Sequence, residues 1–556
     1  MGFRLATAVT PAETATSVDT LSVPASRVVE AGTPCLTEPP KPASRQGYGT
    51  LQKSKFRCLP PIMGLILVIA WLTTRLYSRP PYLKRIIMSN MAQPRVSEDD
   101  INALRTEFRG DVLVRTDEGY DEARSIWNAM IDKHPAVIAR PLGASDVMAA
   151  VAFARDHELE IAIHGGGHNV AGNAVCDDGM MIDCSAMKSV RVDPDQQTAW
   201  VEPGALLHDV DVEAQAHGLV LPGGYVSSTG VAGLTLGGGF GHLSRTFGLT
   251  VDSLRSVEVV TADGRFVTAS ESENPDLFWA LRGGGGNFGV VTAFEFDLHE
   301  LDPTVLAGPV VYSITDAPTV MREVAEAIDQ GPDEVACMMA IRKAPPAPFL
   351  PEEVHGELVL MVVVMYAGDV DTGESVLAPI RKIGSPIADA VGPKPYAMFQ
   401  TMFDGATNSG ARNYWKAHYL PEMSDEAIDI MCEYATTIDS PETTIGMMAL
   451  GREISRRPAD STPYQHRDAE WVVNIQSRWR DAGEDDSQIA WARDLFDALT
   501  PHATGGAYVN FISQDEGEQR VHDAFGDEVY DRLAAVKAEW DPENVFHLNH
   551  NIQPAV

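Results

Sequence analysis

Cysteine is scarce in this sequence. Six cysteines in 556 residues are too few for a disulfide framework, and Cys176 and Cys184 lie eight residues apart rather than in a C-x-x-C pair. We interpret Cys337 and Cys432 as buried or incidental thiols. No metal-ligand spacing, phosphate-binding P-loop or G-x-S-x-G elbow is present, so we predict no metal site. These features favour a protein of the reducing cytoplasm.

Basic residues are also few. The net charge is −35, and residues 1–90 hold 11 Lys+Arg against 4 Asp+Glu, so the other 466 residues carry 32 basic and 74 acidic groups, a net of −42. Nucleic-acid binding requires basic patches, so this negative field argues against a nucleic-acid partner. A solvated acidic surface is the simpler interpretation. The hydrophobic fraction of 44% is ordinary and permits a large core.

The first 90 residues differ from the rest. Residues 1–50 are rich in Thr, Ser, Pro, Ala and Glu without an apolar period, which is typical of disorder. Residues 58–74 are uncharged and apolar, but 17 residues fall short of the roughly 20 that cross a bilayer. We expect a disordered or misassigned extension, with Met88 or Met91 close to the true start. A short membrane anchor is the alternative, and we consider membrane contact the less favoured reading.

Regular elements are expected from about Ser97 onward. Ser97 precedes three acidic residues and is a plausible helix N-cap. Residues 146–157 have helical apolar spacing, and a short buried strand follows and ends at glycine. The alternating segment 256–270 predicts a hairpin with Asp263-Gly264 as its turn. Beyond Leu301 we predict strands over 356–368 and 443–451 and helices near 316–330, 371–384 and 424–437.

Three glycine-rich segments stand within about 125 residues. They are HGGGH from His164 to His168, STGVAGLTLGGGFG from Ser228, and RGGGGNFG from Arg282. Glycine permits positive φ and close approach of the main chain, so successive N–H groups can point at a pyrophosphate. One such segment is weak evidence, because it can be merely a turn. Their recurrence predicts phosphate binding.

Five separated segments together resemble a known family. HGGGHNVAG, TGVAGLTLGGGFG, PDLFWALRGGGGNFG, YVN and NHNIQP match, in this order, signature segments of the berberine bridge enzyme-like FAD-linked oxidases. The resemblance covers roughly residues 91–556 and implies an FAD-binding PCMH-type fold. It also implies that His168 is bonded covalently to the 8α-methyl of FAD. A lone histidine would not support that role, since histidines are more often structural.

The resemblance implies further site residues. Tyr508 would face the flavin as catalytic base, although a phenol needs positive charge or hydrogen bonds to act near neutrality. Asn549 and Asn551 would form hydrogen bonds with the flavin or with the closing strand. Val290 or Val291 would approach the adenine. The residues expected to clasp the FAD otherwise are Gly165, Gly166, Gly167, Asn169, Ser228, Thr229, Gly230, Gly233, Gly237 and Gly238. Ordinary turn or core roles remain the alternative for each.

Two positions depart from the family pattern. Many relatives carry arginine at the place of His164, which would contact the cofactor or simply support the loop. Some relatives attach FAD a second time through a cysteine at the place of Val226, and valine cannot form that thioether. We therefore expect a single covalent bond, through His168.

The overall expectation is an α+β fold of two domains. An FAD-binding domain spans 91–301, a substrate domain with a mainly antiparallel sheet spans 302–500, and 501–556 returns to the first domain. Some segments resemble those that face the pocket in bacterial relatives, and they contain candidates for substrate contact, although aromatic residues at such positions are more often core residues. The candidates are Tyr396, Gln400, Asn413, Tyr414, Trp415 and Lys416.

The function implied is an FAD-dependent oxidase of a small molecule such as an alcohol, a sugar or a secondary metabolite. Hydride would pass to flavin N5, and dioxygen would be the acceptor and yield hydrogen peroxide. A flavin dehydrogenase with another acceptor is the enzyme alternative. A flavin-binding protein without turnover is the alternative of another class.

Mass spectrometry of flavopeptides tests the single attachment. The purified protein should yield one flavin-bearing peptide, containing His168, because position 226 offers no sulfur. A second linkage, or FAD released on acid precipitation, would contradict this expectation.

Overall fold

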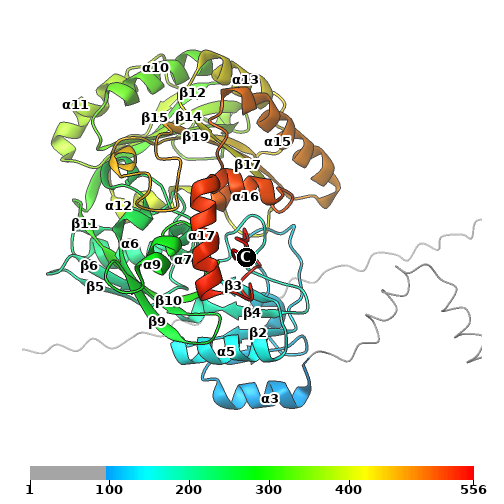
Figure 1. Ribbon diagram of the computed structural model, residues 1–556. Coiled ribbons are helices and arrows are strands. Elements are labelled where there is room, and N and C mark those ends of the chain that lie inside the picture. Colours follow the sequence, from blue (N-terminus) through cyan, green and yellow to red (C-terminus); the bar gives the residue numbers. More distant parts are fainter. Residues whose placement is uncertain (1–95) are drawn as a thin grey trace, which may run out of the picture. The chain divides into compact units, whose positions relative to one another are not determined.

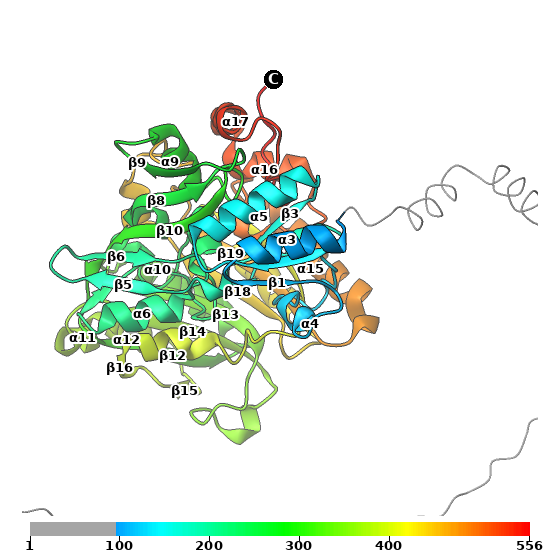
Figure 2. The ribbon, with the colours of Figure 1, turned by 90° about the horizontal axis from the view of Figure 1, so that it is seen from below.

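The computed structural model describes residues 96–556, in which the N-terminal half builds two small sheets (Figures 1 and 2). The first has the order β1 (Asp111–Leu113), β2 (Val137–Arg140), β4 (Met180–Asp183), β3 (Ile161–His164), with parallel pairing of β4 to both β2 and β3. The second is antiparallel, in the order β5 (Val190–Asp193), β6 (Thr198–Val201), β10 (Val290–Asp297), β8 (Leu254–Val260), β9 (Phe266–Ser270). Predictions for the extension 1–90 and the apolar stretch 58–74 lie outside the described residues.

Helices cover and connect these sheets. They are α3 (Glu98–Glu107), α4 (Tyr120–Ala123), α5 (Ala144–Asp156), α6 (Leu207–Gln215), α7 (Val231–Leu236), α8 (Ser244–Phe247) and α9 (Pro275–Leu281). Ser97 caps α3, as predicted, and forms a reciprocal capping box with Asp100. The hairpin β8–β9 and its turn are also confirmed, with Gly264 at φ +83°. A two-stranded ribbon of β7 (Leu219–Val220) and β11 (His299–Glu300) adjoins them.

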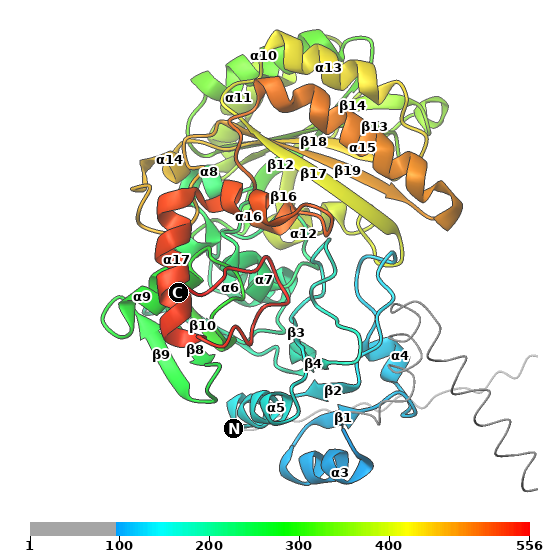
Figure 3. The same ribbon diagram turned by 45° about the vertical axis from the view of Figure 1, so that its right-hand side comes forward.

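The third sheet is large and antiparallel throughout. Its order is β15 (Ala388–Asp389), β12 (Thr304–Ser313), β14 (Leu358–Tyr366), β13 (Val335–Lys343), β18 (Thr444–Ala449), β19 (Trp471–Trp479), β17 (Arg412–Leu420), and β16 (Gly392–Pro395) pairs with β12. Helices α10 (Ala317–Gln330), α11 (Val370–Arg381), α13 (Asp425–Ala435) and α15 (Asp485–Leu499) cover its outer face (Figures 1 and 3). The strands predicted near 356–368 and 443–451 are confirmed, as is the mainly antiparallel sheet. The short helices α12 (Tyr396–Gln400) and α14 (Glu453–Arg456) lie in its connections.

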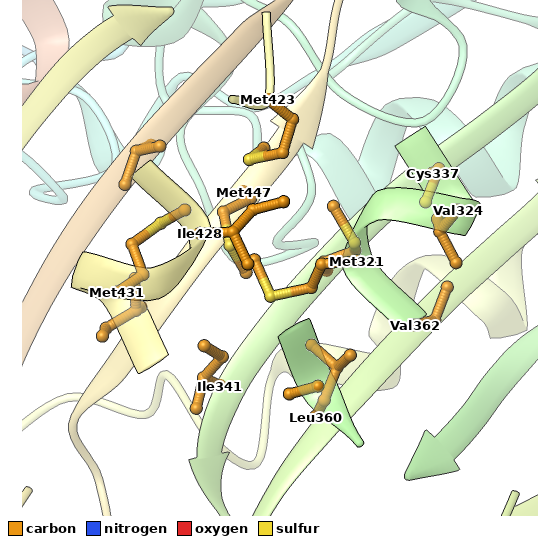
Figure 4. Packing of buried hydrophobic residues seen from close by; sticks show 14 of the residues in the cluster. Met321, Val324, Cys337, Ile341, Leu360, Val362, Met423, Ile428, Met431 and Met447 are labelled. Carbon is orange, nitrogen blue, oxygen red and sulfur yellow. The ribbon is translucent and has the colours of Figure 1, made fainter. Parts of the chain in front are cut away.

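Alternation along the strands gives this sheet two different faces. Cys337 and Ile341 of β13 point outward and lie in one buried cluster with Met321 and Val324 of α10 (Figure 4). Met339 of the same strand belongs to this cluster. Met338, Ala340 and Arg342 of the same strand therefore point to the opposite face, where they line a cavity. One sheet thus supplies a hydrophobic core on one side and a site wall on the other.

The C-terminal segment packs back on the N-terminal half. It contains α16 (Glu518–Phe525) and α17 (Asp527–Trp540), and Leu533 and Ile552 lie in the same buried cluster as Phe288. The Lys537 ammonium is fully buried and donates to the Asn287 carbonyl at 2.6 Å, the Phe546 carbonyl at 2.9 Å and Asp541 Oδ2 at 2.7 Å. This bonding ties the third glycine segment to the chain end.

The described residues 96–556 belong to one compact unit. The boundaries at 301/302 and 500/501 stay predictions. The cysteines within the described residues, namely Cys176, Cys184, Cys337 and Cys432, are free thiols, as expected. Over the same residues no helix is both long and apolar enough to traverse a bilayer.

Lys537→Met tests the buried ion pair. It leaves the Asp541 carboxylate buried without its cation, and such a loss destabilises a protein by about 3–5 kcal/mol. Urea unfolding should show this loss. Arg322→Met, which removes exposed pairs with Asp425 and Asp429, should lower the free energy of unfolding far less, because solvent screens exposed ion pairs. Equal effects of the two substitutions would contradict the role given to Lys537.

Candidate active site

A cavity of about 610 Å³ lies between the first two glycine segments and the inner face of the large sheet, and no residue of the third segment lines it. One wall is the loop 165–169, and a second comes from residues 224–234. The sheet contributes Met338, Ala340, Met361 and Met448, and Tyr508, Asn510 and Phe511 complete the wall. The lining is mainly apolar with a few polar groups, which is typical of a site for an organic ligand.

His168 points into this cavity from the end of the first glycine segment. Strand β3 ends at His164, and three glycines carry the chain to His168. The imidazole stacks on Trp127, with ring centroids 5.2 Å apart and an interplanar angle of 17°, and its Nε2 lies 3.3 Å from Ser228 Oγ. Burial, together with the positive charge of Arg478, lowers the pKa of His168 to about 4. The ring is therefore neutral at pH 7 and keeps a nitrogen lone pair for bond formation.

His164 supports the loop 165–169 through its contacts with Asp183 and Gly167. Its Nδ1 lies 2.9 Å from Asp183 Oδ1, and Asp183 also pairs with Arg140 at 3.0 Å. Gly167 has φ +67°, and a Cβ there would lie 2.4 Å from His164 Nε2. The His164 ring thus occupies the space beside Gly167, so only glycine fits at that position.

The first two glycine segments cross in direct contact. A Cβ on Gly166 would lie 2.5 Å from the backbone N and Cα of Gly230, and a Cβ on Gly230 would lie 2.5 Å from Gly166 N. Leu206 bridges to Gly230, and the Val231 N–H donates to the Ala205 carbonyl at 3.0 Å. The two main chains can meet only because both residues lack a side chain.

Tyr508 faces the cavity from the C-terminal segment. Its hydroxyl oxygen accepts hydrogen bonds from the Gly239 N–H at 3.2 Å and from Asn510 Nδ2 at 3.0 Å. The ring packs against Phe240, at 4.7 Å, and Phe511, at 4.8 Å. Burial raises the pKa of Tyr508 to about 12, and the two donors oppose that rise. Both donors stabilise the phenolate form.

The structure brings many of the predicted residues to one place. Those that line the cavity are Gly165, Gly166, Gly167, His168, Asn169, Thr229, Gly230, Gly233 and Tyr508. Ser228 contacts His168. Gly237 lies beside the Asn510 amide and Gly238 beside the Tyr464 ring, so these two glycines stand behind the wall.

Other predicted residues lie elsewhere. Val290 and Val291 begin β10 with buried side chains that belong to hydrophobic core clusters, so they are not part of the cavity wall. Asn549 donates to the carbonyls of Gly286, at 3.2 Å, and Phe546, at 3.0 Å. Buried Oδ1 atoms of Asn549 and Asn551 have no hydrogen-bond partner. Such orphaned acceptors beside a glycine segment fit a bound polar group, as FAD would supply.

The substrate-contact candidates divide between the faces of their elements. Trp415 lines the cavity, whereas Tyr414 and Lys416 point to the opposite face of β17, toward Asp515 and Glu516. Asn413 is tied to Asn128, with its N–H 3.0 Å from Asn128 Oδ1. Tyr396 and Gln400 are buried in α12, and Gln400 Nε2 donates to the Gly224 carbonyl at 3.2 Å. Of the six candidates, Trp415 is the one on the cavity wall.

Sequence reasoning missed several wall residues. Trp127 lies in a loop 41 positions before His168, and no local sequence pattern predicts that the two rings stack. Arg342 and Arg478 are the second-last residues of strands β13 and β19. Their places follow from alternation only once each strand is known to have a cavity face. Arg478 also lies 5.3 Å from the centroid of the Trp127 ring, so Arg478, Trp127 and His168 form a continuous contact.

Two family models match this chain. The FAD binding domain matches residues 135–270, and the model described as berberine and berberine like matches residues 507–553. An FAD-linked oxidoreductase of Dictyostelium discoideum is 30% identical over 461 residues, which are 82% of this chain and 97% of the relative. The (R)-6-hydroxynicotine oxidase of Paenarthrobacter nicotinovorans is 31% identical over 458 residues, 80% and 97% of the two chains.

Solved structures agree with the sequence matches. The crystal structure of 6-hydroxy-D-nicotine oxidase from Arthrobacter nicotinovorans has a TM-score of 0.73 and 29% identity, and the match covers 81% of this chain and 98% of that one. Glucooligosaccharide oxidase from Acremonium strictum, described as carrying 6-S-cysteinyl, 8α-N1-histidyl FAD, has a TM-score of 0.73, 26% identity and coverage of 82% and 100%. The α+β fold expected from the sequence is thereby confirmed.

Gly230→Ala tests the crossing of the glycine segments. The new methyl would press on the Gly166 backbone, which should cost about 1–3 kcal/mol and displace the loop that ends at His168. Gly233→Ala is the matched control, because a Cβ there meets no protein atom within 4 Å. Thermal midpoint and flavin content should both fall in G230A, whereas G233A should keep its thermal midpoint. An unchanged G230A would contradict the close contact.

Proposed function

Since this chain belongs to the berberine bridge enzyme-like family of FAD-linked oxidoreductases, we propose that it is an oxidase of a small organic molecule, with FAD attached through His168. Bound FAD would accept a hydride at N5 and pass the electrons to dioxygen, giving hydrogen peroxide. The nicotine and oligosaccharide oxidases among its relatives support an oxidase function. The substrate is an alcohol, a sugar or a related metabolite.

One observation carries this proposal. His168 and Tyr508, from segments 340 positions apart in the chain, lie on the wall of one cavity. His168 is neutral at pH 7, as an imidazole that forms a covalent bond must be. Tyr508 offers a phenol at the same cavity. A cofactor anchor and a proton acceptor are therefore available to one ligand space.

Tyr508 serves as the proton acceptor in this proposal. Its oxygen already accepts hydrogen bonds from Gly239 and Asn510, so these two donors stabilise the charge when the phenol is ionised. The phenolate would take the hydroxyl proton of the substrate as hydride leaves the adjacent carbon. Because burial holds the pKa of Tyr508 near 12, the reactive form is a minor fraction at pH 7 and grows tenfold per pH unit.

Each of two alternative functions differs from the proposed oxidase in one step that can be measured. A dehydrogenase would be reduced by substrate but reoxidised slowly by dioxygen, which stopped-flow mixing with aerated buffer detects. A flavin-binding protein without turnover would show no flavin bleaching with alcohols, sugars and phenolic metabolites under anaerobic conditions. Rapid bleaching followed by rapid reoxidation supports the oxidase.

Tyr508→Phe tests the proposed base. Anaerobic flavin reduction should slow by about 10²–10⁴-fold, and its rise with pH between 7 and 10 should disappear, because no ionisable oxygen remains. FAD should stay bound. Tyr464→Phe is the control, since that neighbouring buried hydroxyl bonds to Tyr419 and would change the rate little. Unchanged reduction in Y508F would remove Tyr508 from the mechanism.

A further inference from the structure

Four polar side chains form a row across the inner face of the large sheet. They come from four adjacent strands in direct register, with Arg342 opposite Thr444, Thr444 opposite Gln476, and Gln476 opposite Trp415. All four line the cavity. We call them the donor row. Each of the four can donate hydrogen bonds from its side chain.

The protein leaves most of these donors unused. Trp415 Nε1 is buried without a partner, and Thr444 is 6% exposed with no side-chain hydrogen bond within the described residues. Arg342 makes only two long contacts, to the carbonyls of Lys343 at 3.4 Å and Pro441 at 3.5 Å. Within residues 96–556, no carboxylate lies within 4 Å of its guanidinium. A buried donor without a partner costs free energy, so its retention points to a ligand.

The presence of Arg342 on the cavity wall is not explained by a role in holding the turn that contains Pro441. Lys343 Nζ already donates to the Asp439 carbonyl at 2.7 Å, and Ser440 Oγ donates to the Arg478 carbonyl at 2.6 Å. The turn that contains Pro441 is therefore fastened from both sides. The long contact of Arg342 with Pro441 adds little to it.

The charge around the donor row is positive in an otherwise acidic protein. Arg478 and Arg480 share the single carboxylate of Glu442, at 2.8 and 2.6 Å. Of these groups, Arg342, Arg478 and Glu442 line the cavity, so the two guanidiniums and one carboxylate leave one positive charge without an acidic partner. Residues 91–556 carry a net charge of −42, so the cavity wall has the opposite sign to the whole. Such a wall attracts an anion.

We propose that the donor row binds a carboxylate, and hence that the substrate is an organic acid oxidised at a carbon remote from its acid group. This inference rests on the proposed function. The planar guanidinium of Arg342 matches a carboxylate, and Thr444 on the next strand is the nearest further donor of the row. Gln476 and Trp415, on the strands beyond, offer donors to other polar groups of the same ligand. The one unpaired positive charge of the donor row, on Arg342, corresponds to one negative charge on the ligand.

The position of the donor row determines how far the acid group of the substrate lies from the carbon that is oxidised. Arg342 stands four residues beyond Met338 on β13, which is roughly 13 Å along a strand. Met338 packs in the same cluster as Tyr508. The carboxylate therefore binds away from the reacting end, and the apolar surfaces of Ala340 and Met361 line the space between.

Binding of matched probes to the holoenzyme tests the proposal. Calorimetry and the perturbation of the flavin spectrum would compare 3-phenylpropanoate with 3-phenylpropanamide, which differ in charge at one end. The native protein should bind the carboxylate at least about tenfold more tightly. Arg342→Gln should abolish this preference, and Arg342→Lys should retain part of it. Arg322→Gln, which removes an arginine from the outer helix α10, should leave it unchanged.

Several results would overturn the proposal. They are equal affinity for the acid and the amide, a preference that survives in R342Q, or tighter binding of phenyl phosphate than of the carboxylate. Because these are binding measurements, they are independent of turnover. Carboxylate binding without flavin reduction by any substrate would refute the proposed function alone, and reduction by neutral substrates without carboxylate preference would refute this inference alone.

Discussion

The contact between Gly166 and Gly230 is the constraint on which the site depends. Two main chains from different elements meet with no side chain between them, and a Cβ on either residue would come within 2.5 Å of the other backbone. This contact fixes where the first glycine segment ends, and therefore where His168 enters the cavity. The ring of His164 sets the other side of the loop, beside Gly167. A pair of glycines thus determines the placement of the proposed FAD anchor.

The large sheet supplies the second part of the design. Its outer face is closed by helices around Met339 and Ile341, which leaves the inner face free to line a cavity. Because strand residues alternate, apolar Met338 and cationic Arg342 share that inner face four positions apart. The same strands therefore contribute to the hydrophobic core and to the lining of the site. This lining changes from apolar near Tyr508 to polar at the donor row.

Local signals predicted much of this arrangement. The Ser97 cap, the Asp263-Gly264 turn and the strands over 356–368 and 443–451 depend on neighbours in sequence, and the structure has them. The glycine segments indicated close backbone approach, and most of their predicted residues line the cavity. Trp127 and Arg478 could not be found in this way, because the stacking of Trp127 on His168 and of Arg478 on Trp127 depends on how distant segments pack. Lys416 was placed beside Trp415 as an equal candidate, but strand alternation turns its side chain to the other face.

The central claim is that the flavin is held by His168 and spans the cavity toward Tyr508. A crystal structure of the purified yellow holoprotein tests it most directly. We expect continuous density from the His168 imidazole to the flavin 8α carbon, with the ring lying between the loop 165–169 and the inner face of the large sheet. A flavin in another part of the molecule, or a ring with no bond to His168, would contradict it.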